Sequence, residues 1–269
     1  MHPSIQLYVV LEDRYRSQAQ PAGLIQSFKE HGFQVNVIGS NKAKRKLYRD
    51  TQHRKLAIVR GRSRELLDLV AQLESRGVQT INRSGAINSV LDKSHMAVAL
   101  EKAGIPTPVT YYEPASILAK RLPPGAYPLI LKPVFGDNAR GLQIVFSAEE
   151  LSTLNWLEPL ALAQKYLIND GYDLKLYGIG EEVWAVRKPS PLPIHPSVKR
   201  PAELLHITPE LKSLGQRCGA LFGLELYGVD CILTRSGPVV IEVNDYPNYT
   251  GISEANDRLA DYVIRKVWN

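Results

Sequence analysis

Two neighbouring segments decide the fold of this chain: Gly228-Val229-Asp230-Cys231-Ile232-Leu233 and Gly237-Pro238-Val239-Val240-Ile241-Glu242-Val243-Asn244. Their apolar cores, Val229–Leu233 and Val239–Val243, predict two β-strands. The residues between them, Thr234 to Pro238, are typical of a turn. The pattern therefore predicts an antiparallel hairpin near the C-terminal end of the chain.

Three polar side chains of this hairpin point to a metal site. Glu242 and Asn244 lie two residues apart on one strand, so they face the same way. With Asp230 they offer hard oxygen donors, which Mg²⁺ prefers and which it shares with nucleotide phosphates and water. An ordinary amphipathic hairpin with a solvated acidic face is the alternative, and these residues alone leave it open.

Length and composition set the broad class of protein. The chain has 269 residues, 44% hydrophobic and 22% charged, which is typical of a globular protein of two small domains or one large one. No apolar run approaches the roughly 18 residues of a membrane span, and residues 1–6 do not resemble a secretory signal. The two cysteines, Cys218 and Cys231, belong to no ligand cluster, so we expect reduced thiols and a cytoplasmic location.

The positive charge is concentrated in one segment. The chain carries +6, but residues 42–64 carry +9, so the remainder carries −3. Such a patch favours an anionic partner, namely a phosphorylated substrate, an acidic peptide or nucleic acid, and the alternative is a solvated loop. Nucleic acid is disfavoured because Tyr48 is the only aromatic residue of the patch. Its basic residues are Lys42, Lys44, Arg45, Lys46, Arg49, Arg54, Lys55, Arg60, Arg62 and Arg64.

The first 90 residues predict a parallel sheet covered by helices, because strand and helix patterns alternate there. The predicted strands are 5–11, 35–38 and 56–59, and the predicted helices are 20–31 and 64–76. Farther along, the pattern predicts helices at 93–102 and 148–155, strands at 129–132, 142–146 and 162–167, and a hairpin from 174–177 and 183–186. The proline-rich segment 189–209 predicts a loop.

Lys132 ends a predicted strand and precedes a loop with glycines at both ends, Gly136 and Gly141. Glycines let backbone amides approach a phosphate closely, and a lysine supplies a compact cation. Neither the P-loop pattern nor the dinucleotide fingerprint is present. Charged residues also mark the next hairpin, with Asp173 and Lys175 on one strand and Arg187 and Lys188 on the other. Taken singly, each of them is better explained as plain surface charge.

In this order the segments resemble the ATP-grasp superfamily, specifically its RimK-type branch of ribosomal-protein glutamate ligases. The resemblance covers most of the chain, although each motif is short. Its motifs are Asn82 to Ile87, Asp92-Lys93, Ala103 to Pro108, Leu131-Lys132-Pro133, Gly136 to Gly141, Gln164 to Leu167, Asp173-Leu174-Lys175, Gly228-Val229-Asp230 and Glu242-Val243-Asn244.

The resemblance implies an α/β fold, with α+β character in the ATP-grasp half. An N-terminal parallel-sheet domain (1–90) would precede a central ATP-grasp subdomain (91–168) and a C-terminal one with the metal site (169–269). ATP would bind between the two subdomains.

The resemblance also implies a role for each matching residue. Lys93 and Lys132 would contact the ATP phosphates, and Arg187 would neutralise the transferred phosphoryl group, so Lys132 and Arg187 are the predicted catalytic residues. Asp230, Glu242 and Asn244 would hold two Mg²⁺ ions, with Mn²⁺ as an alternative. The remaining predicted nucleotide-binding residues are the covering loop (Gly136, Asp137, Asn138, Ala139, Arg140 and Gly141), the adenine-binding hinge (Gln164, Lys165, Tyr166 and Leu167), and Asp173 with Lys175.

The implied activity is carboxylate–amine ligation through an acyl phosphate, with a small molecule or an acidic peptide as substrate. Homo-oligomers also occur among such enzymes. Two segments depart from the ligase pattern: Pro189 to Pro193 after Arg187, and Asp245 to Tyr249 after Asn244. Three segments, Lys175 to Tyr177, Val186 to Ser190 and Tyr246 to Tyr249, also resemble the inositol trisphosphate kinases of the same superfamily. An ATP-grasp kinase that phosphorylates an anionic polyol is therefore the alternative.

Overall fold

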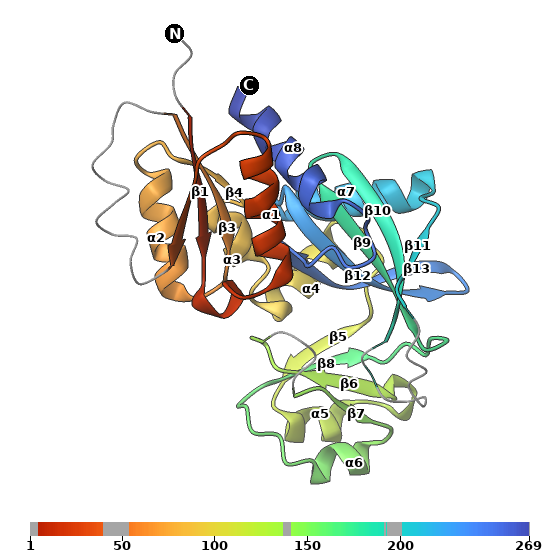
Figure 1. Ribbon diagram of the computed structural model, residues 1–269. Coiled ribbons are helices and arrows are strands. Elements are labelled where there is room, and N and C mark those ends of the chain that lie inside the picture. Colours follow the sequence, from red (N-terminus) through yellow and green to blue (C-terminus); the bar gives the residue numbers. More distant parts are fainter. Residues whose placement is uncertain (1–4, 40–53, 137–140, 191, 193–200, 269) are drawn as a thin grey trace.

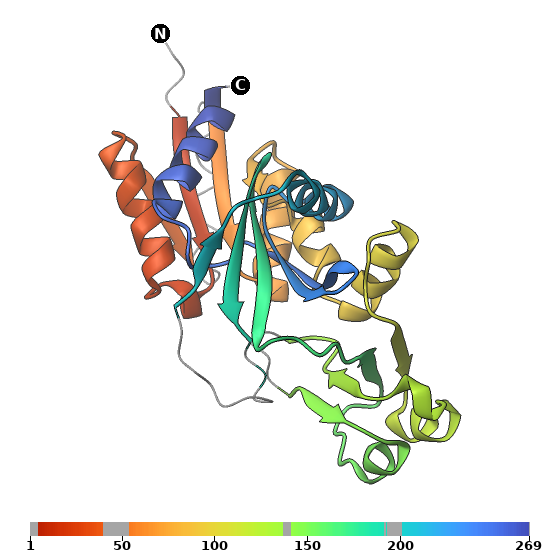
Figure 2. The ribbon, with the colours of Figure 1, turned by 90° about the vertical axis from the view of Figure 1, so that its right-hand side faces the viewer.

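The structure, a computed structural model, describes residues 5–39, 54–136, 141–190, 192 and 201–268. Within these ranges the chain forms three β-sheets with helices packed on them (Figures 1 and 2). One sheet is parallel and two are antiparallel, which confirms the predicted α/β class with α+β character in the second half. No helix of the described ranges is long and apolar enough to cross a membrane.

Sheet A is the parallel sheet and has the strand order β2-β1-β3-β4. Its strands are β1 (Ile5–Leu11), β2 (Val35–Gly39), β3 (Arg54–Arg60) and β4 (Gln79–Ile81), and its helices are α1 (Ala19–Glu30), α2 (Arg64–Glu74) and α3 (Ser84–Ser89), with a short 3₁₀ turn η1 (Asp13–Tyr15). Parallel neighbours need crossover connections, which α1 and α2 supply. The predicted strands and helices of this region are confirmed to within two residues at each end.

Sheet B forms the lower lobe in Figure 1 and has the strand order β5-β8-β6-β7. Its elements are β5 (Thr110–Glu113), α5 (Ala115–Arg121), η2 (Pro124–Ala126), β6 (Leu129–Lys132), β7 (Gln143–Val145), α6 (Ala148–Thr153) and β8 (Ala161–Lys165). Helices α5 and α6 pack on each other and bury Leu118 and Leu151 against Leu129 and Leu131 of β6. This small core leaves the opposite face of the sheet turned towards the rest of the molecule.

Sheet C has the order β11-β10-β9-β12-β13 and contains the predicted metal-site hairpin. Its elements are β9 (Tyr172–Ile179), β10 (Glu182–Pro189), β11 (Glu203–Leu205), α7 (Pro209–Phe222), β12 (Leu226–Thr234) and β13 (Gly237–Asp245). One face of the sheet packs against α7 and α4 (Lys93–Lys102). The predicted pairing of β9 with β10 and of β12 with β13 is confirmed.

Sheets A and C share one hydrophobic core. Leu7 and Phe28 of the first half pack with Tyr177 and Leu226 of sheet C, and with Val263 of the C-terminal helix α8 (Ala255–Trp268). Figures 1 and 2 show α8 beside α1, on one face of sheet A. The domain boundaries at residues 90 and 168 stay a prediction, but the first and third parts of the chain are joined through their apolar side chains.

The predicted loop at 189–209 is wrong for its described C-terminal part. Strand β11 pairs with β10 there, with Leu205 opposite Ala185. Helix α7 then begins at Pro209, after the Thr208 side chain accepts a hydrogen bond from the Leu211 amide. A proline in the first helical turn after a threonine cap indicates the start of a helix. The high proline content of the whole segment had favoured a loop instead. Residues 191 and 193–200 lie outside the described ranges.

Candidate active site

A cavity of about 510 Å³ lies where the three sheets meet. The loop after β3 of sheet A borders it, together with β6 of sheet B and β9, β12 and β13 of sheet C. Among the described residues, six Lys or Arg and four Asp or Glu line it, so this part of its wall carries net positive charge and suits an anion. The predicted site residues along it are Lys93, Lys132, Gly136, Asp173, Lys175, Asp230, Glu242 and Asn244.

Strand pairing brings the three predicted metal ligands together. Asp230 lies opposite Glu242 on β13 and opposite Lys175 on β9, and Gly228 lies opposite Asn244. Residues directly opposite each other in an antiparallel pair share one face, so the oxygens line the same wall. A register shift follows Asp230, and the extra residue that it inserts on β13 is Ile241, which lines the cavity beside Glu242.

Each predicted metal ligand contacts a cationic side chain. The pairs are Lys175 Nζ with Asp230 Oδ2 at 2.6 Å, Lys93 Nζ with Glu242 Oε1 at 3.5 Å, and Arg62 Nη2 with Asn244 Oδ1 at 3.0 Å. Burial lowers the pKa of Lys175, but the attraction of Asp230 and the hydrogen bond to it, together with the attraction of Asp173 and Tyr177, outweigh burial and raise the pKa to about 12. In the described ranges no three His, Cys, Asp or Glu side chains form a metal cluster. The predicted set is instead two carboxylates and an amide, whose hard oxygens fit Mg²⁺.

Lys132 is buried at the end of β6, and its Nζ donates a hydrogen bond to Gln164 Oε1 at 2.6 Å. Desolvation lowers the pKa of Lys132, against the attraction of Glu242. In the described ranges the lysine contacts no carboxylate at ion-pair distance, and its hydrogen-bond partner is a neutral amide. The predicted hinge residue Gln164 therefore holds the Lys132 ammonium in place.

The rest of the predicted hinge makes structural contacts. Lys165 Nζ donates to the carbonyls of Gly125 and Ala126 at 3.1 Å and to that of Tyr127. The backbone amides of Lys165 and Tyr166 donate to Val109 and Pro128. None of Gln164 to Leu167 is among the described residues that line the cavity, so their role in adenine binding stays a prediction.

The covering loop is described only at its two ends. Gly136 and Gly141 have φ angles of 147° and 73°, which favour glycine, and the Gly136 carbonyl accepts a hydrogen bond from Lys93 Nζ. Asp137, Asn138, Ala139 and Arg140 lie outside the described ranges, so their predicted contact with phosphate stays a prediction. The role of the basic residues within 42–53 also stays a prediction, because these residues lie outside the described ranges.

The structure places Arg187 away from the cavity and Lys188 on its wall. Arg187 pairs across the sheet with Leu174 and contacts Asp170 at 2.5 Å, with its guanidinium 3.9 Å from the centre of the Tyr172 ring. Lys188 pairs with Asp173, so strand alternation turns it to the face that carries the predicted site. The two-residue period of a strand, followed from Asp173 and Lys175 through the turn to the paired strand, would have placed Lys188 on this face from the sequence.

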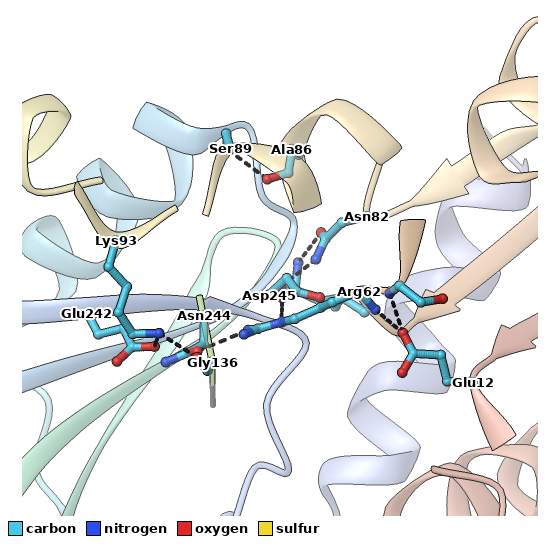
Figure 3. Close-up of polar contacts among 12 residues, drawn as sticks. Glu12, Arg62, Asn82, Ala86, Ser89, Lys93, Gly136, Glu242, Asn244 and Asp245 are labelled. Atoms are coloured by element: carbon cyan, nitrogen blue, oxygen red, sulfur yellow. Dashed lines mark hydrogen bonds and ion pairs between the residues drawn. The ribbon is translucent and has the colours of Figure 1, made fainter. Parts of the chain in front are cut away.

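Sequence reasoning missed a chain of polar contacts from sheet A to β13, the strand that carries two of the predicted metal ligands (Figure 3). Arg62 Nε donates to Asp245 Oδ1 at 2.6 Å, while Nη2 of the same guanidinium reaches Asn244. The backbone amides of Arg62 and Ser63 donate to Glu12 Oε1, which follows β1. Asp245 is only 5% exposed, and desolvation raises its pKa against the attraction of Arg62. The only signal in the sequence is the position of Glu12 and Arg62 after parallel strands, where sites in such sheets gather.

Comparison with known proteins identifies relatives of the whole chain. A family model described as a RimK-like ATP-grasp domain matches residues 90–266. A probable alpha-L-glutamate ligase of Methanococcoides burtonii is 28% identical, over 96% of this chain and 94% of the relative.

Solved structures show the same fold. The ATP-grasp ligase PsnB, complexed with minimal precursor, Mg and ADP, has a TM-score of 0.75 at 18% identity, over 97% of each chain. A RimK domain protein ATP-grasp from Sphaerobacter thermophilus has a TM-score of 0.68 at 20% identity, over 96% of this chain and 99% of that one. At such identities the likeness concerns the fold.

Proposed function

The chain belongs to the RimK-like ATP-grasp family, and on this premise we propose that it is an ATP- and Mg²⁺-dependent carboxylate–amine ligase. The observation that carries the proposal is the cavity in which Lys93 and Lys132 lie with Asp230, Glu242 and Asn244. The relatives named as probable alpha-L-glutamate ligases favour an amino acid such as L-glutamate as the amine.

In this proposal the lysines bind and orient the triphosphate. Lys132 is desolvated and contacts no carboxylate within the described ranges, so a phosphate oxygen would gain most of its attraction. Lys93 would release Glu242 Oε1, now 3.5 Å away, and contact the same phosphates. The loop between Gly136 and Gly141 would exclude water, and residues 164–167 would hold the adenine.

Asp230, Glu242 and Asn244 would hold the Mg²⁺ ions, and we propose two of them, with Mn²⁺ as an alternative. When bound, the metal supplies positive charge against the triphosphate. Lys175 holds Asp230 in place and Arg62 holds the Asn244 amide, so both donors are oriented by side chains that the structure describes. The ligands of the proposed site are thus supported by a second set of contacts.

The proposed reaction has two steps. A carboxylate oxygen of the acceptor attacks the γ-phosphorus, the bond to the bridging oxygen of ADP breaks, and an acyl phosphate forms. The amine nitrogen then attacks the acyl carbon, inorganic phosphate leaves, and the nitrogen loses a proton to give the amide. Water exclusion matters because water competes with the amine for the acyl phosphate.

We propose a small carboxylic acid or an acidic peptide as the acceptor, since net positive charge lines the cavity. A reducing, cytoplasmic location stays a prediction that rests on the two buried free cysteines. Association into a homo-oligomer also stays a prediction. The comparisons give no support to the inositol-kinase alternative.

Hydroxylamine trapping tests the proposal. The protein is incubated with ATP, Mg²⁺, hydroxylamine and a panel of carboxylates that includes L-glutamate and glutamate-ending peptides. We expect ADP, inorganic phosphate and a hydroxamate in equal amounts. A kinase would leave the phosphoryl group on its acceptor and yield no hydroxamate. Phosphate release without hydroxamate from any carboxylate would reject the ligase.

A further inference from the structure

Arg60 is a buried cation on the sheet A wall of the cavity. It is the last residue of β3, it is 4% exposed, and its neighbours Gly61 and Arg62 also line the cavity. Arginine is almost never buried so deeply unless it is paired, because removing its charge from water is costly. The groups that contact Arg60 therefore indicate its role.

The described contacts of Arg60 are all with neutral groups. Its Nη atoms donate to the side-chain oxygens of Gln18, at 3.1 Å, and of Gln20 and Asn248. Two aromatic rings flank the guanidinium carbon, that of Tyr15 at 4.8 Å and that of Tyr246 at 5.0 Å. Within the described ranges, Arg60 Nε is buried and has no hydrogen-bond partner. Burial lowers the pKa of Arg60, against the attraction of Tyr246, Tyr15 and Asp245.

The charge of Arg62, two residues along the chain from Arg60, is compensated by a carboxylate. Its guanidinium contacts the Asp245 carboxylate at 2.6 Å and the Asn244 amide at 3.0 Å. Asp245 therefore already pairs with a cation, and the described groups in direct contact with the Arg60 guanidinium are amide oxygens and aromatic rings. A buried guanidinium held in one orientation by three amides is pre-organised for a planar anion with two oxygens.

We propose that Arg60 binds a spectator carboxylate of the ligase substrates, that is, a carboxylate that is not activated. The proposal rests on the proposed function. The activated carboxylate must lie near the phosphate-binding side, where Lys132 enters from sheet B, whereas Arg60 enters from sheet A. The spectator group belongs either to the amino acid that supplies the amine or to an acidic acceptor. In both cases Arg60 selects substrates with a second carboxylate over neutral ones.

The test measures binding without turnover. Wild type and Arg60→Gln are titrated calorimetrically with L-glutamate, glutarate and L-glutamine amide, which has no carboxylate, in the presence of Mg²⁺ and AMPPNP. We expect Arg60→Gln to weaken binding of a carboxylate probe about tenfold to hundredfold and to leave AMPPNP affinity within about twofold. Arg64→Gln, an exposed neighbour on α2, is the matched control and should bind as wild type does.

The two probes separate the two sources of the carboxylate. A loss confined to L-glutamate assigns the group to the amine substrate, and a loss that includes glutarate, which has no amine, assigns it to the acceptor. Unchanged affinity of folded Arg60→Gln for both probes overturns the inference. If Arg60→Gln does not fold, the affinities of wild type for L-glutamate and L-glutamine amide are compared instead. Equal affinities overturn the inference. A preference of tenfold or more for L-glutamate that is reduced in Arg60→Lys supports the inference.

These outcomes are distinct from those of the ligase proposal. Carboxylate binding that depends on Arg60, without any hydroxamate in the trapping experiment, would keep the subsite and reject the ligase. Hydroxamate formation with unchanged probe binding in Arg60→Gln would keep the ligase and reject the subsite.

Discussion

The β12–β13 hairpin and the loop after β3 line the same cavity, but different kinds of information place their residues. In the hairpin, Asp230 meets Glu242 because a short turn joins two antiparallel strands. In the loop, Arg62 meets Asn244 and Asp245 from 182 and 183 residues away along the chain. Local periodicity predicts the first arrangement, whereas only the packing of sheet A on sheet C produces the second.

The two regions also differ in how their charges are balanced. The hairpin carboxylates contact lysines that enter from β9 and α4, and Asp245 contacts Arg62 from sheet A. The hairpin supplies the oxygens of the proposed metal site, and the loop after β3 orients one of them. Substitutions should therefore affect activity most in the hairpin and stability most in the loop.

The largest expected effect is in the hairpin. Glu242→Gln should lower turnover at least about a hundredfold, because it removes a charged oxygen from the proposed metal site. The readout is phosphate release under the conditions of the trapping experiment, with the melting temperature measured in parallel. Glu101→Gln, on the exposed side of α4, is the control and should keep normal turnover. Near-normal turnover of folded Glu242→Gln would remove the metal assignment.

Lys132→Met should lower turnover about a hundredfold by removing a phosphate contact. It also gives a pH test, because the pKa of Lys132 lies below the ordinary lysine value of 10.5. Between the lowered pKa and 10.5 the unfolded chain binds more protons than the folded one, so wild type gains stability as pH rises. Lys132→Met lacks this gain. The free energy of unfolding of wild type minus that of Lys132→Met should therefore increase from pH 7 to pH 10. A difference independent of pH would mean that Lys132 titrates normally.

In the loop, Arg62→Gln should lower the free energy of unfolding by about 3 kcal/mol, because it leaves the Asp245 carboxylate buried without its cation. Urea denaturation measures this loss. The pKa of Asp245 is already raised by burial, so the folded state binds more protons than the unfolded one above pH 3.8, and stability there falls as pH rises. The free energy of unfolding that Arg62→Gln loses relative to wild type should therefore become smaller as pH is lowered.

The double variant Arg62→Gln/Asp245→Asn is the control for the loop. Removing the second charge should restore part of the lost stability, since no unpaired charge then stays buried. A double variant as unstable as Arg62→Gln would mean that the loss comes from packing and not from the ion pair.

The smallest expected effect separates two neighbours on β10. Lys188→Met should lower turnover about tenfold, because Lys188 lines the cavity, whereas Arg187→Met should change it less than about threefold. The two variants serve as controls for each other. The reverse ranking would support the sequence-based prediction of Arg187 as a catalytic residue.

Much of the fold could be predicted because its elements show a clear local period. Strands β1, β2 and β3 of sheet A, helix α4 and the two hairpins of sheet C lie where the apolar pattern predicted them, whereas β4 was not predicted. Strand β11 and helix α7 were missed because prolines stand at the helix start and in the segment before β11. Helix α8 was also missed, and no local signal relates it to sheet A, on which it packs.

The sequence alone determined the composition of the site: which strands carry oxygen donors, which lysines precede or follow a glycine loop, and which of these side chains share a face. These properties follow from the two-residue period of a strand and from chain order. The tertiary structure decided which cations compensate those oxygens and that Arg60 is buried among neutral partners. Such facts depend on contacts between segments far apart in the chain, which only the packing of the sheets brings together.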